Sequence, residues 1–541
     1  MPAMKRAQLS GPRANAHEDT RWCQLRRGGW PCMSAVDGPT RDAATRAPAP
    51  ATPAPEAGKI NISLLSHTNV GKTTLARTLL RKDIGEVGDR AHVTEVAESH
   101  VLIESTLGDS LILWDTPGFG DSTRVLKRLQ QNEKPVGWFL SRVWDRFADR
   151  PFWCSQQAMH NAREMSDVVL YVVNAGEQPS SAGYVDAEIR ILGWIGKPVI
   201  LLLNQLGPPR DAAQSQADVA QWQAHIAQYK WIETVLPFDA FARCWVQEGT
   251  LLAQVQRLLT QRKQPVFARL RESWRERNLA VFRDSMQALA DQIAAAAVDA
   301  ERVEERDIQG KARAWIGAMA TGVESSDPGL ERAQTDLAGR LDSQIRSTTA
   351  KLVQLHGLTG RATDEVLKRM GREFAIDRPA DADKASVLGG LVSGALGGLA
   401  ADLGAGGLTF GAGALIGGVL GAFGARGLAK AYNLARGANT GTVRWSREFL
   451  FARVAAALMR YLAVAHFGRG RGEFVSGVAP AHWQEAVQQA LGRRKAGLDA
   501  VWAGTSPNSQ LVTAAALLPL VTASAQEVLI QLYPDVSPVF E

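Results

Sequence analysis

One short segment limits the fold of this chain more than any other feature. Residues 60–65 are largely apolar, residues 66–73 read Ser-His-Thr-Asn-Val-Gly-Lys-Thr, and a helix-forming segment follows directly. A loop of this composition between a strand and a helix wraps phosphate groups with its backbone N–H groups. Ser66 stands where the motif usually has glycine, and the other positions fit. The segment therefore predicts a phosphate-binding loop (P-loop) in an α/β domain.

The residues of this loop have distinct predicted roles. Gly71 lets the backbone approach the phosphates, Lys72 supplies positive charge to the β- and γ-phosphates, and the Thr73 hydroxyl is a ligand for Mg²⁺. The dipole of the following helix adds to the attraction. We predict that the nucleotide contacts these loop residues: Ser66, His67, Thr68, Asn69, Val70, Gly71, Lys72, Thr73 and Thr74.

A second motif, Asp115-Thr-Pro-Gly118, follows the apolar residues 111–114. An aspartate at the carboxyl end of a strand can hold Mg²⁺, usually through water, and the Gly118 amide can reach the γ-phosphate. Thr94 lies between the two motifs, where a threonine can bind Mg²⁺ and sense the γ-phosphate. The predicted catalytic residues are Lys72, Thr94 and Gly118, and the predicted metal ligands are Thr73, Thr94 and Asp115.

Base recognition is less clearly specified. Asn204-Gln-Leu-Gly207 stands where a guanine-reading Asn-Lys-x-Asp would be expected. Asn204 is retained, but Gln205 replaces the lysine and Gly207 replaces the carboxylate that pairs with guanine. The residues alone therefore leave the choice between GTP and ATP open. Asp239 follows the last predicted strand, where a final base-contacting loop belongs.

Short apolar runs alternate with helix-forming segments between residues 60 and 240. The runs 168–173 and 199–203 are continuously apolar, as in strands that are buried on both faces of a parallel sheet. The predicted fold is therefore an α/β P-loop NTPase domain with a mostly parallel six-stranded sheet. The predicted strands are 60–65, 101–106, 110–114, 167–174, 198–204 and 234–238.

The second half of the chain has helical patterns. No glycine or further proline interrupts residues 265–309, and apolar residues spaced by four and three from Phe282 to Val303 form a heptad seam. We predict one long helix there, a turn at Asp327-Pro-Gly329 and a returning helix with leucines between 330 and 355.

The predicted parts are a disordered segment (1–58), the P-loop domain (59–260) with an aromatic insert (120–165), and a helical domain (261–541) with long helices (265–357), a glycine-rich hairpin (385–425) and an amphipathic tail (444–541).

Three of these parts leave alternatives open. The insert can pack on its own domain or present its aromatic side chains to a partner. Residues 385–425 carry one charge, Asp402, in two arms that are each about long enough to span a bilayer. They form either a membrane hairpin or a glycine-rich hairpin buried in protein. Residues 1–58 lack the apolar run of a secretory signal, and Met33 is an alternative translation start.

Composition excludes some classes of protein. The four cysteines form no Cys-x-x-Cys pair, which argues against a structural zinc site and a disulfide framework and fits a reducing cytoplasm. The net charge of +6 is small for 541 residues, so it only weakly favours a nucleic-acid partner. We expect a cytoplasmic protein, with the inner membrane as a peripheral or integral location if residues 385–425 contact lipid.

The motifs around Lys72, Thr94, Asp115 and Asn204 together resemble those of translation-factor-class GTPases. The string Asn-Val-Gly-Lys-Thr is most similar to the Era-like and tRNA-modifying branch. The whole layout resembles an uncharacterised bacterial family that joins such a domain to a C-terminal helical domain of unknown function. The resemblance implies GTP and Mg²⁺ as cofactors, and K⁺ near the phosphates at Asn69.

Position 119 carries a further implication of this resemblance. Phe119 stands where Ras-like enzymes place a glutamine that orients the attacking water. An apolar side chain cannot polarise water. The chain therefore resembles GTPases whose hydrolysis needs K⁺, homodimerisation or a group supplied by a partner. We expect a slow GTPase switch that drives the helical domain. The alternatives are a membrane-associated, nucleotide-dependent scaffold and a ribosome- or RNA-associated GTPase.

Overall fold

The computed structural model describes residues 57–81, 96–131, 133–141, 149–206, 212–240, 244–304, 328–357, 432–436, 440–466 and 481–541. They all belong to one compact unit, Pro55–Glu541. Four predictions concern residues outside these ranges. They are the disordered segment up to residue 56, the metal ligand Thr94, the glycine-rich hairpin 385–425, and the role of Gly207.

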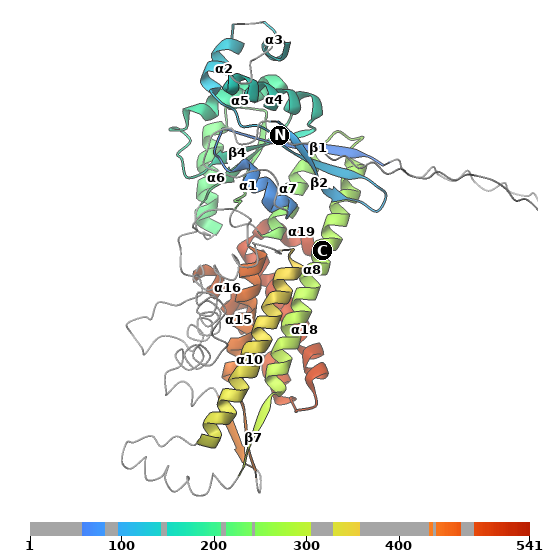
Figure 1. Cartoon of the computed structure of the whole chain (residues 1–541), viewed down its shortest axis with the longest axis vertical. Coiled ribbons are helices and arrows are strands. Elements are labelled where there is room, and N and C mark those ends of the chain that lie inside the picture. The colour runs from blue at the N-terminus through green and yellow to red at the C-terminus, as the bar shows by residue number, and fades with distance from the viewer. Residues whose placement is uncertain are drawn as a thin grey trace, which may run out of the picture. The chain divides into compact units, whose positions relative to one another are not determined.

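The first half of the compact unit is built on a six-stranded sheet in the order β2-β3-β1-β4-β5-β6 (Figure 1). β2 is antiparallel to β3, and every other neighbouring pair is parallel. The strands are β1 (Lys59–Ser66), β2 (Glu98–Glu104), β3 (Ser110–Asp115), β4 (Val168–Asn174), β5 (Val199–Asn204) and β6 (Ile232–Pro237). The predicted mostly parallel six-stranded sheet is therefore confirmed.

The central strands explain why the sheet is covered on both faces. All six residues of β5 and the first six of β4 are buried. Leu170 and Ile200 belong to one hydrophobic core, whereas Tyr171 and Leu201 belong to another. Because successive side chains of a strand point to opposite faces, the two cores lie on the two sides of the sheet. The main covering helices are α1 (Lys72–Leu80), α5 (Gly183–Ile195), α6 (Ala212–Ile226) and α7 (Trp245–Leu258).

The aromatic insert is helical where it is described. Its elements are α2 (Ser122–Leu129), α3 (Pro135–Ser141), α4 (Arg150–His160) and a π-helical turn, η1 (Asn161–Met165). Phe139 and Phe152 are fully buried with their ring centroids 6.0 Å apart, in the same core as Tyr171. The guanidinium of Arg124 lies 4.6 Å from the centre of the Phe152 ring. Packing within the domain therefore accounts for both phenylalanines.

The second half is helical, as predicted. Its helices are α8 (Gln264–Val298), α10 (Pro328–Leu355), α15 (Arg447–Ala465), α16 (Ala481–Arg493), α17 (Lys495–Ala503), α18 (Gln510–Leu532), a 3₁₀ turn, η4 (Pro534–Val536), and α19 (Ser537–Phe540). α8 packs against α18, α10 and α15 (Figure 1). A small antiparallel sheet, in the order β7-β9-β8, accompanies them: β7 (Ala300–Glu304), β8 (Tyr432–Arg436) and β9 (Thr440–Trp445).

The long helix is shorter than its sequence pattern predicts. The heptad seam is buried from Phe282 to Ala296, but α8 ends at Val298. Asp299 is extended, and the next residues pair as β7 with β9. β7 is an edge strand of the small sheet, and its pairing with β9 bonds one side of its backbone. A contact distant in sequence therefore overrides the local helical pattern. The prediction of a helix through residues 300–304 was therefore wrong.

The second and last strands of the large sheet each begin a few residues before their predicted starts, β2 at Glu98 and β6 at Ile232. Two boundaries of the helical half also differ from the prediction. The turn expected at residues 327–329 is the start of α10, since Pro328 and Gly329 are already helical. Proline fits the first position of a helix because it lacks only an N–H group that would have no intrahelical partner. The returning helix itself is present, with Leu337, Leu341 and Ile345 buried. The tail predicted as helical from residue 444 begins with the last two residues of β9.

Candidate nucleotide site

The P-loop connects β1 to α1. Gly71, at the N-cap of α1, has φ +88°, and a Cβ atom there would lie 2.8 Å from the side-chain nitrogen of Asn204. Both the backbone conformation and the close approach therefore require glycine. Asn69 also has a positive φ, +65°, which asparagine tolerates better than most residues. At the position of the missing glycine, the Ser66 hydroxyl donates to the His67 carbonyl, 2.7 Å away.

Asp115 lies at the carboxyl end of β3, next to the start of α1. The Lys72 amine donates to one of its carboxylate oxygens at 2.8 Å, and the Thr73 hydroxyl donates to the other at 2.7 Å. Lys72 and Asp115 are both buried. Mg²⁺ in nucleotide sites is bound by one or two protein oxygen ligands together with phosphates and water. The adjacent oxygens of Thr73 and Asp115 therefore fit this ion.

The segment after Asp115 lies directly beside the P-loop. Phe119 donates its N–H to the Ser66 carbonyl at 2.8 Å, and its carbonyl accepts from the Thr68 N–H at 3.3 Å. A Cβ atom on Gly118 would lie 3.1 Å from the backbone of Thr68, which is closer than an ordinary contact, so this close approach favours glycine. The Phe119 ring is fully buried in the same core as Phe152. It therefore cannot orient water at the phosphates.

The buried carboxylate of Glu188, which the motifs did not indicate, supports the P-loop through hydrogen bonds. Nδ1 of His67 lies 2.6 Å from one oxygen of Glu188, and the Ser122 hydroxyl donates to the same oxygen. The Tyr171 hydroxyl donates to the other oxygen at 2.8 Å. Burial, together with this carboxylate, raises the pKa of Tyr171 well above its usual value. Glu188 thus joins the P-loop, β4, α5 and the first residue of α2.

A sequence signal for this network does exist. Val185, Ile189 and Leu192 are spaced as the buried face of α5, and Glu188 lies on that face. A buried carboxylate is stable only with hydrogen-bond or charged partners. An acid on an apolar helix face therefore predicts a buried polar network, although it does not identify the partners.

The residues predicted to contact the base lie together at the ends of β5 and β6. The Asn204 side chain donates to the Val70 carbonyl at 2.7 Å and accepts from the Ala240 N–H at 2.8 Å. The buried Asp239 carboxylate accepts from the Leu206 N–H at 2.7 Å. Gln205, between these contacts, has φ +58°. Asn204 therefore links the P-loop to the predicted base-contacting loop.

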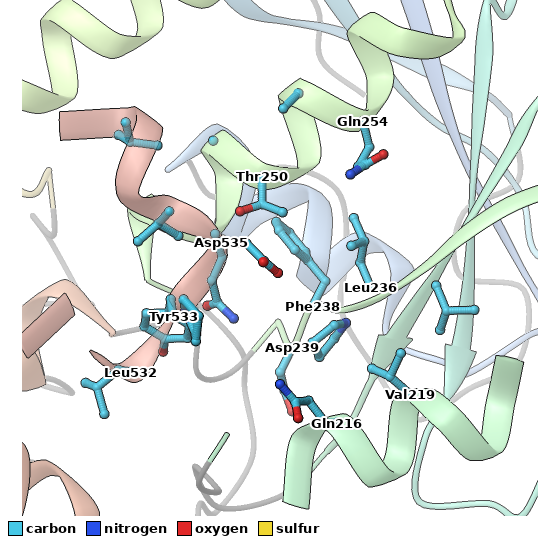
Figure 2. A pocket seen from close by; sticks show the side chains of 18 of the residues that line it. Gln216, Val219, Leu236, Phe238, Asp239, Thr250, Gln254, Leu532, Tyr533 and Asp535 are labelled. Atoms are coloured by element: carbon cyan, nitrogen blue, oxygen red, sulfur yellow. The ribbon is translucent and has the colours of Figure 1, made fainter. Parts of the chain in front are cut away.

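A large cavity begins at this loop (Figure 2). Its volume is about 980 Å³, and its lining includes Leu206 together with Phe238 and Asp239, which are labelled in Figure 2. Its other walls come from α6, α7, α8 and the C-terminal residues around Tyr533. Lys72, Thr73 and Asp115 do not line it. The cavity is therefore distinct from the phosphate site.

The sheet order, the P-loop and the position of Asp115 define a P-loop GTPase domain. The family described as "50S ribosome-binding GTPase" matches residues 61–205. The family described as "Domain of unknown function (DUF3482)" matches residues 226–511, which is more than half of the 541 residues. This chain belongs to the DUF3482 family. That match starts at the end of α6 and so includes β6 and α7 of the GTPase fold.

Solved structures with a similar fold belong to several GTPases. A variant of Era from Aquifex aeolicus, bound to GDP and AlF4⁻, is 18% identical over 38% of this chain and 57% of its own, with a TM-score of 0.28. SelB from Methanococcus maripaludis, with a GTP analogue, is 14% identical over 38% and 36% of the two chains, with a TM-score of 0.24. NFeoB from S. thermophilus is 14% identical over 40% and 87%, with a TM-score of 0.21. No match was found among the curated proteins.

Proposed function

We propose that this chain is a Mg²⁺-dependent GTPase with a low intrinsic rate and that its nucleotide state controls its helical domain. One observation carries the proposal: Asp115 is held by both Lys72 and Thr73, the residues assigned to the phosphates and to the metal. Nucleotide phosphates would compete with Asp115 for the Lys72 amine.

We further propose residues 59–260 and 261–541 as the two domains, because α7 ends at Leu258 and α8 begins at Gln264.

In this proposal the chain acts mainly by positioning and by charge neutralisation. Lys72 and the P-loop N–H groups stabilise the negative charge on the β- and γ-phosphates. Thr73 and Asp115 would hold Mg²⁺, and Thr94 is the proposed third ligand. The ion supplies further charge neutralisation at the phosphates when it is bound. Gly118 would donate its N–H to the γ-phosphate, so the segment after Asp115 would sense that group.

The proposed low rate rests on Phe119. Its ring is fully buried, so no side chain at that position can orient the attacking water. Hydrolysis would then depend on a group or a cation from elsewhere. Asn69 is the proposed contact for K⁺, since its left-handed backbone places an exposed amide at the P-loop. A second copy of this chain is the other proposed source of a stimulating group.

Transmission to the helical domain is proposed to run through α1. The helix begins at the P-loop, and its C-cap residue, Arg81, donates to the Asn278 side chain on α8 at 2.7 Å. Arg81 also lies 3.9 Å from Glu248 of α7, which accepts from the Trp274 indole of α8 at 2.9 Å. A movement of α1 on nucleotide binding would therefore reach α8 directly.

The test is nucleotide competition and hydrolysis with the full chain. A fluorescent GTP analogue is displaced by GTP or by ATP, in sodium and in potassium buffers, and phosphate release is followed in parallel. We expect preference for GTP, slow release that requires Mg²⁺, and faster release in potassium. Equal displacement by both nucleotides would refute the GTP assignment. Equal rates in sodium and potassium would refute the proposed role of Asn69.

The matched GTPase family supplies a second candidate function, because its description names binding to the 50S ribosome. In this second candidate function, the nucleotide state controls the association of the chain with ribosomes or RNA. Sedimentation with purified 50S subunits, with GTP or GDP present, distinguishes the two candidate functions. Pelleting that depends on GTP would favour the ribosome. Absence from the pellet at low salt would count against it.

A further inference from the structure

One face of α18 carries no partner within the part of the chain that the structure describes. Leu511 and Val512 are 84% and 73% exposed, which are unusually large values for aliphatic side chains. Ala515, Ala516 and Pro519 continue the exposed row at helical spacing. We call these five residues the α18 strip. All of its side chains are apolar.

The chain around the α18 strip contains no ionisable side chain from Ala500 to Gln526, a stretch that covers the end of α17, the turn and most of α18. Three of its hydroxyl groups, those of Thr505, Ser509 and Ser524, donate to backbone carbonyls of the same stretch. Thr505 donates to the Trp502 carbonyl at 2.6 Å, and Ser509 donates to the Ser506 carbonyl at 2.8 Å. These three hydroxyls would keep their hydrogen bonds if the hairpin moved from water to a less polar medium.

Positive charge gathers where α16 meets α17. Arg493, Arg494 and Lys495 follow one another, and both arginines pair with the single carboxylate of Glu527. These partners lower the pKa of Glu527 despite its partial burial. Gly497 contacts Leu520, so the basic residues lie beside the later part of α18. Asp499 lies one turn after Lys495 on α17, so the three basic and two acidic side chains leave this flank with a net charge of +1. An apolar strip with a positive flank is complementary to a bilayer with anionic headgroups.

We propose that the α18 strip binds the surface of an anionic lipid bilayer and that α18 lies in the headgroup region without crossing it. By length and composition, α18 could span a membrane, but nearly half of its most apolar stretch is buried in protein. Its opposite face, however, packs on α8, and spanning would expose that packing. Pro519 also leaves the Ala515 carbonyl without its helical donor, and water in the headgroup region can bond to it.

Vesicle flotation with the full chain tests the proposal. The vesicles contain phosphatidylethanolamine and phosphatidylglycerol, and phosphatidylcholine vesicles serve for comparison. The test variant is Leu511→Asp with Val512→Asp. The matched control, Leu107→Asp with Trp194→Asp, changes two exposed apolar residues of the GTPase domain, which are 49% and 40% exposed. We expect the wild type and the control to float with anionic vesicles and the test variant to lose at least about tenfold in partitioning.

Two further measurements keep the result unambiguous. Circular dichroism should give the same melting curve for the wild type and both variants, because all four changed positions are exposed. Light scattering reports the oligomeric state. The proposal is overturned if the test variant floats as well as the wild type, since lipid binding would then come from elsewhere. It is also overturned if the wild type does not float, or if the test variant differs only by changing from a dimer to a monomer.

Discussion

The side chain of Asn204 donates a hydrogen bond to the backbone carbonyl of Val70 over 2.7 Å. The same amide accepts from the Ala240 N–H. One buried side chain at the end of β5 thus connects the P-loop with the loop after β6. This connection stands even though the lysine and the acid that usually follow such an asparagine are replaced in this chain. The retained asparagine therefore has a structural role apart from any contact with the base.

Replacing Asn204 should weaken nucleotide binding through the P-loop. Asn204→Ala removes two buried hydrogen bonds, and each is worth about 0.5–1.5 kcal/mol. We expect roughly a tenfold rise in the dissociation constant for a fluorescent GTP analogue. Asn174→Ala is the matched control, because Asn174 ends the neighbouring strand β4 and its side chain, among the residues that the structure describes, bonds to nearby Gly176 and Glu177. Similar losses in both variants would show that the Val70 contact is unimportant.

Removal of the buried carboxylate should destabilise the GTPase domain. Glu188→Ala leaves His67, Ser122 and Tyr171 without their shared partner, so we expect a loss of about 3 kcal/mol in the free energy of unfolding. Urea denaturation followed by fluorescence measures it. Glu177→Ala serves as the control, because Glu177 is exposed and bonds Tyr184 at 3.1 Å. A change of less than 1 kcal/mol in Glu188→Ala would contradict the account of this network.

Acid should weaken the contact between α8 and the hairpin that joins β2 to β3. Arg269 donates two hydrogen bonds to Asp109, at 2.7 and 2.8 Å, and holds the pKa of that carboxyl at about 2 instead of 3.8. A lowered carboxyl pKa stabilises the fold above pH 4, and this contribution disappears as the pH falls from about 4 through 2. Arg269→Gln should therefore unfold at a higher pH in an acid titration. An unchanged acid midpoint would refute the role of this pair.

Two buried histidines should make the helical domain sensitive to mild acid. Burial lowers the pKa of His466 to about 4 and that of His356 to about 3, from 6.5. The unfolded chain takes up these protons first, so stability falls as the pH drops from about 6.5 towards 4. Each histidine contributes a slope of about 1.4 kcal/mol per pH unit in that window. Urea denaturation at several pH values should show a shallower slope for His466→Asn, and an unchanged slope would contradict this assignment.

The residues proposed to contact phosphate and metal were easier to predict from the sequence than the residues that hold them in place. The continuous apolar runs of β4 and β5 identified the central strands, because both faces of these strands are buried. The motifs also indicated that Lys72, Thr73 and Asp115 belong together. Residues that follow parallel strands at one edge of a sheet lie close in space. These predictions depend on local patterns, which a single sequence displays.

Contacts between distant segments were not predictable in the same way. The end of α8 at Val298 depends on pairing between Val303 and Gly441, which local pattern does not reveal. The partners of Glu188 come from the P-loop, α2 and β4. The sequence indicates that this carboxylate is buried, but it does not indicate which side chains bond to it. The docking of Arg81 on Asn278 likewise joins the P-loop helix to the other half of the chain.

The most direct test of the central claim is equilibrium titration of a fluorescent GTP analogue, with Mg²⁺, into the full chain and into Lys72→Ala. Lys127→Ala is the control, because Lys127 is an exposed lysine on α2. The account predicts tight binding by the wild type and the control and a loss of roughly 10- to 100-fold in Lys72→Ala, as expected for a lost charge-assisted hydrogen bond. Wild-type affinity in Lys72→Ala would contradict the assignment of the phosphate site.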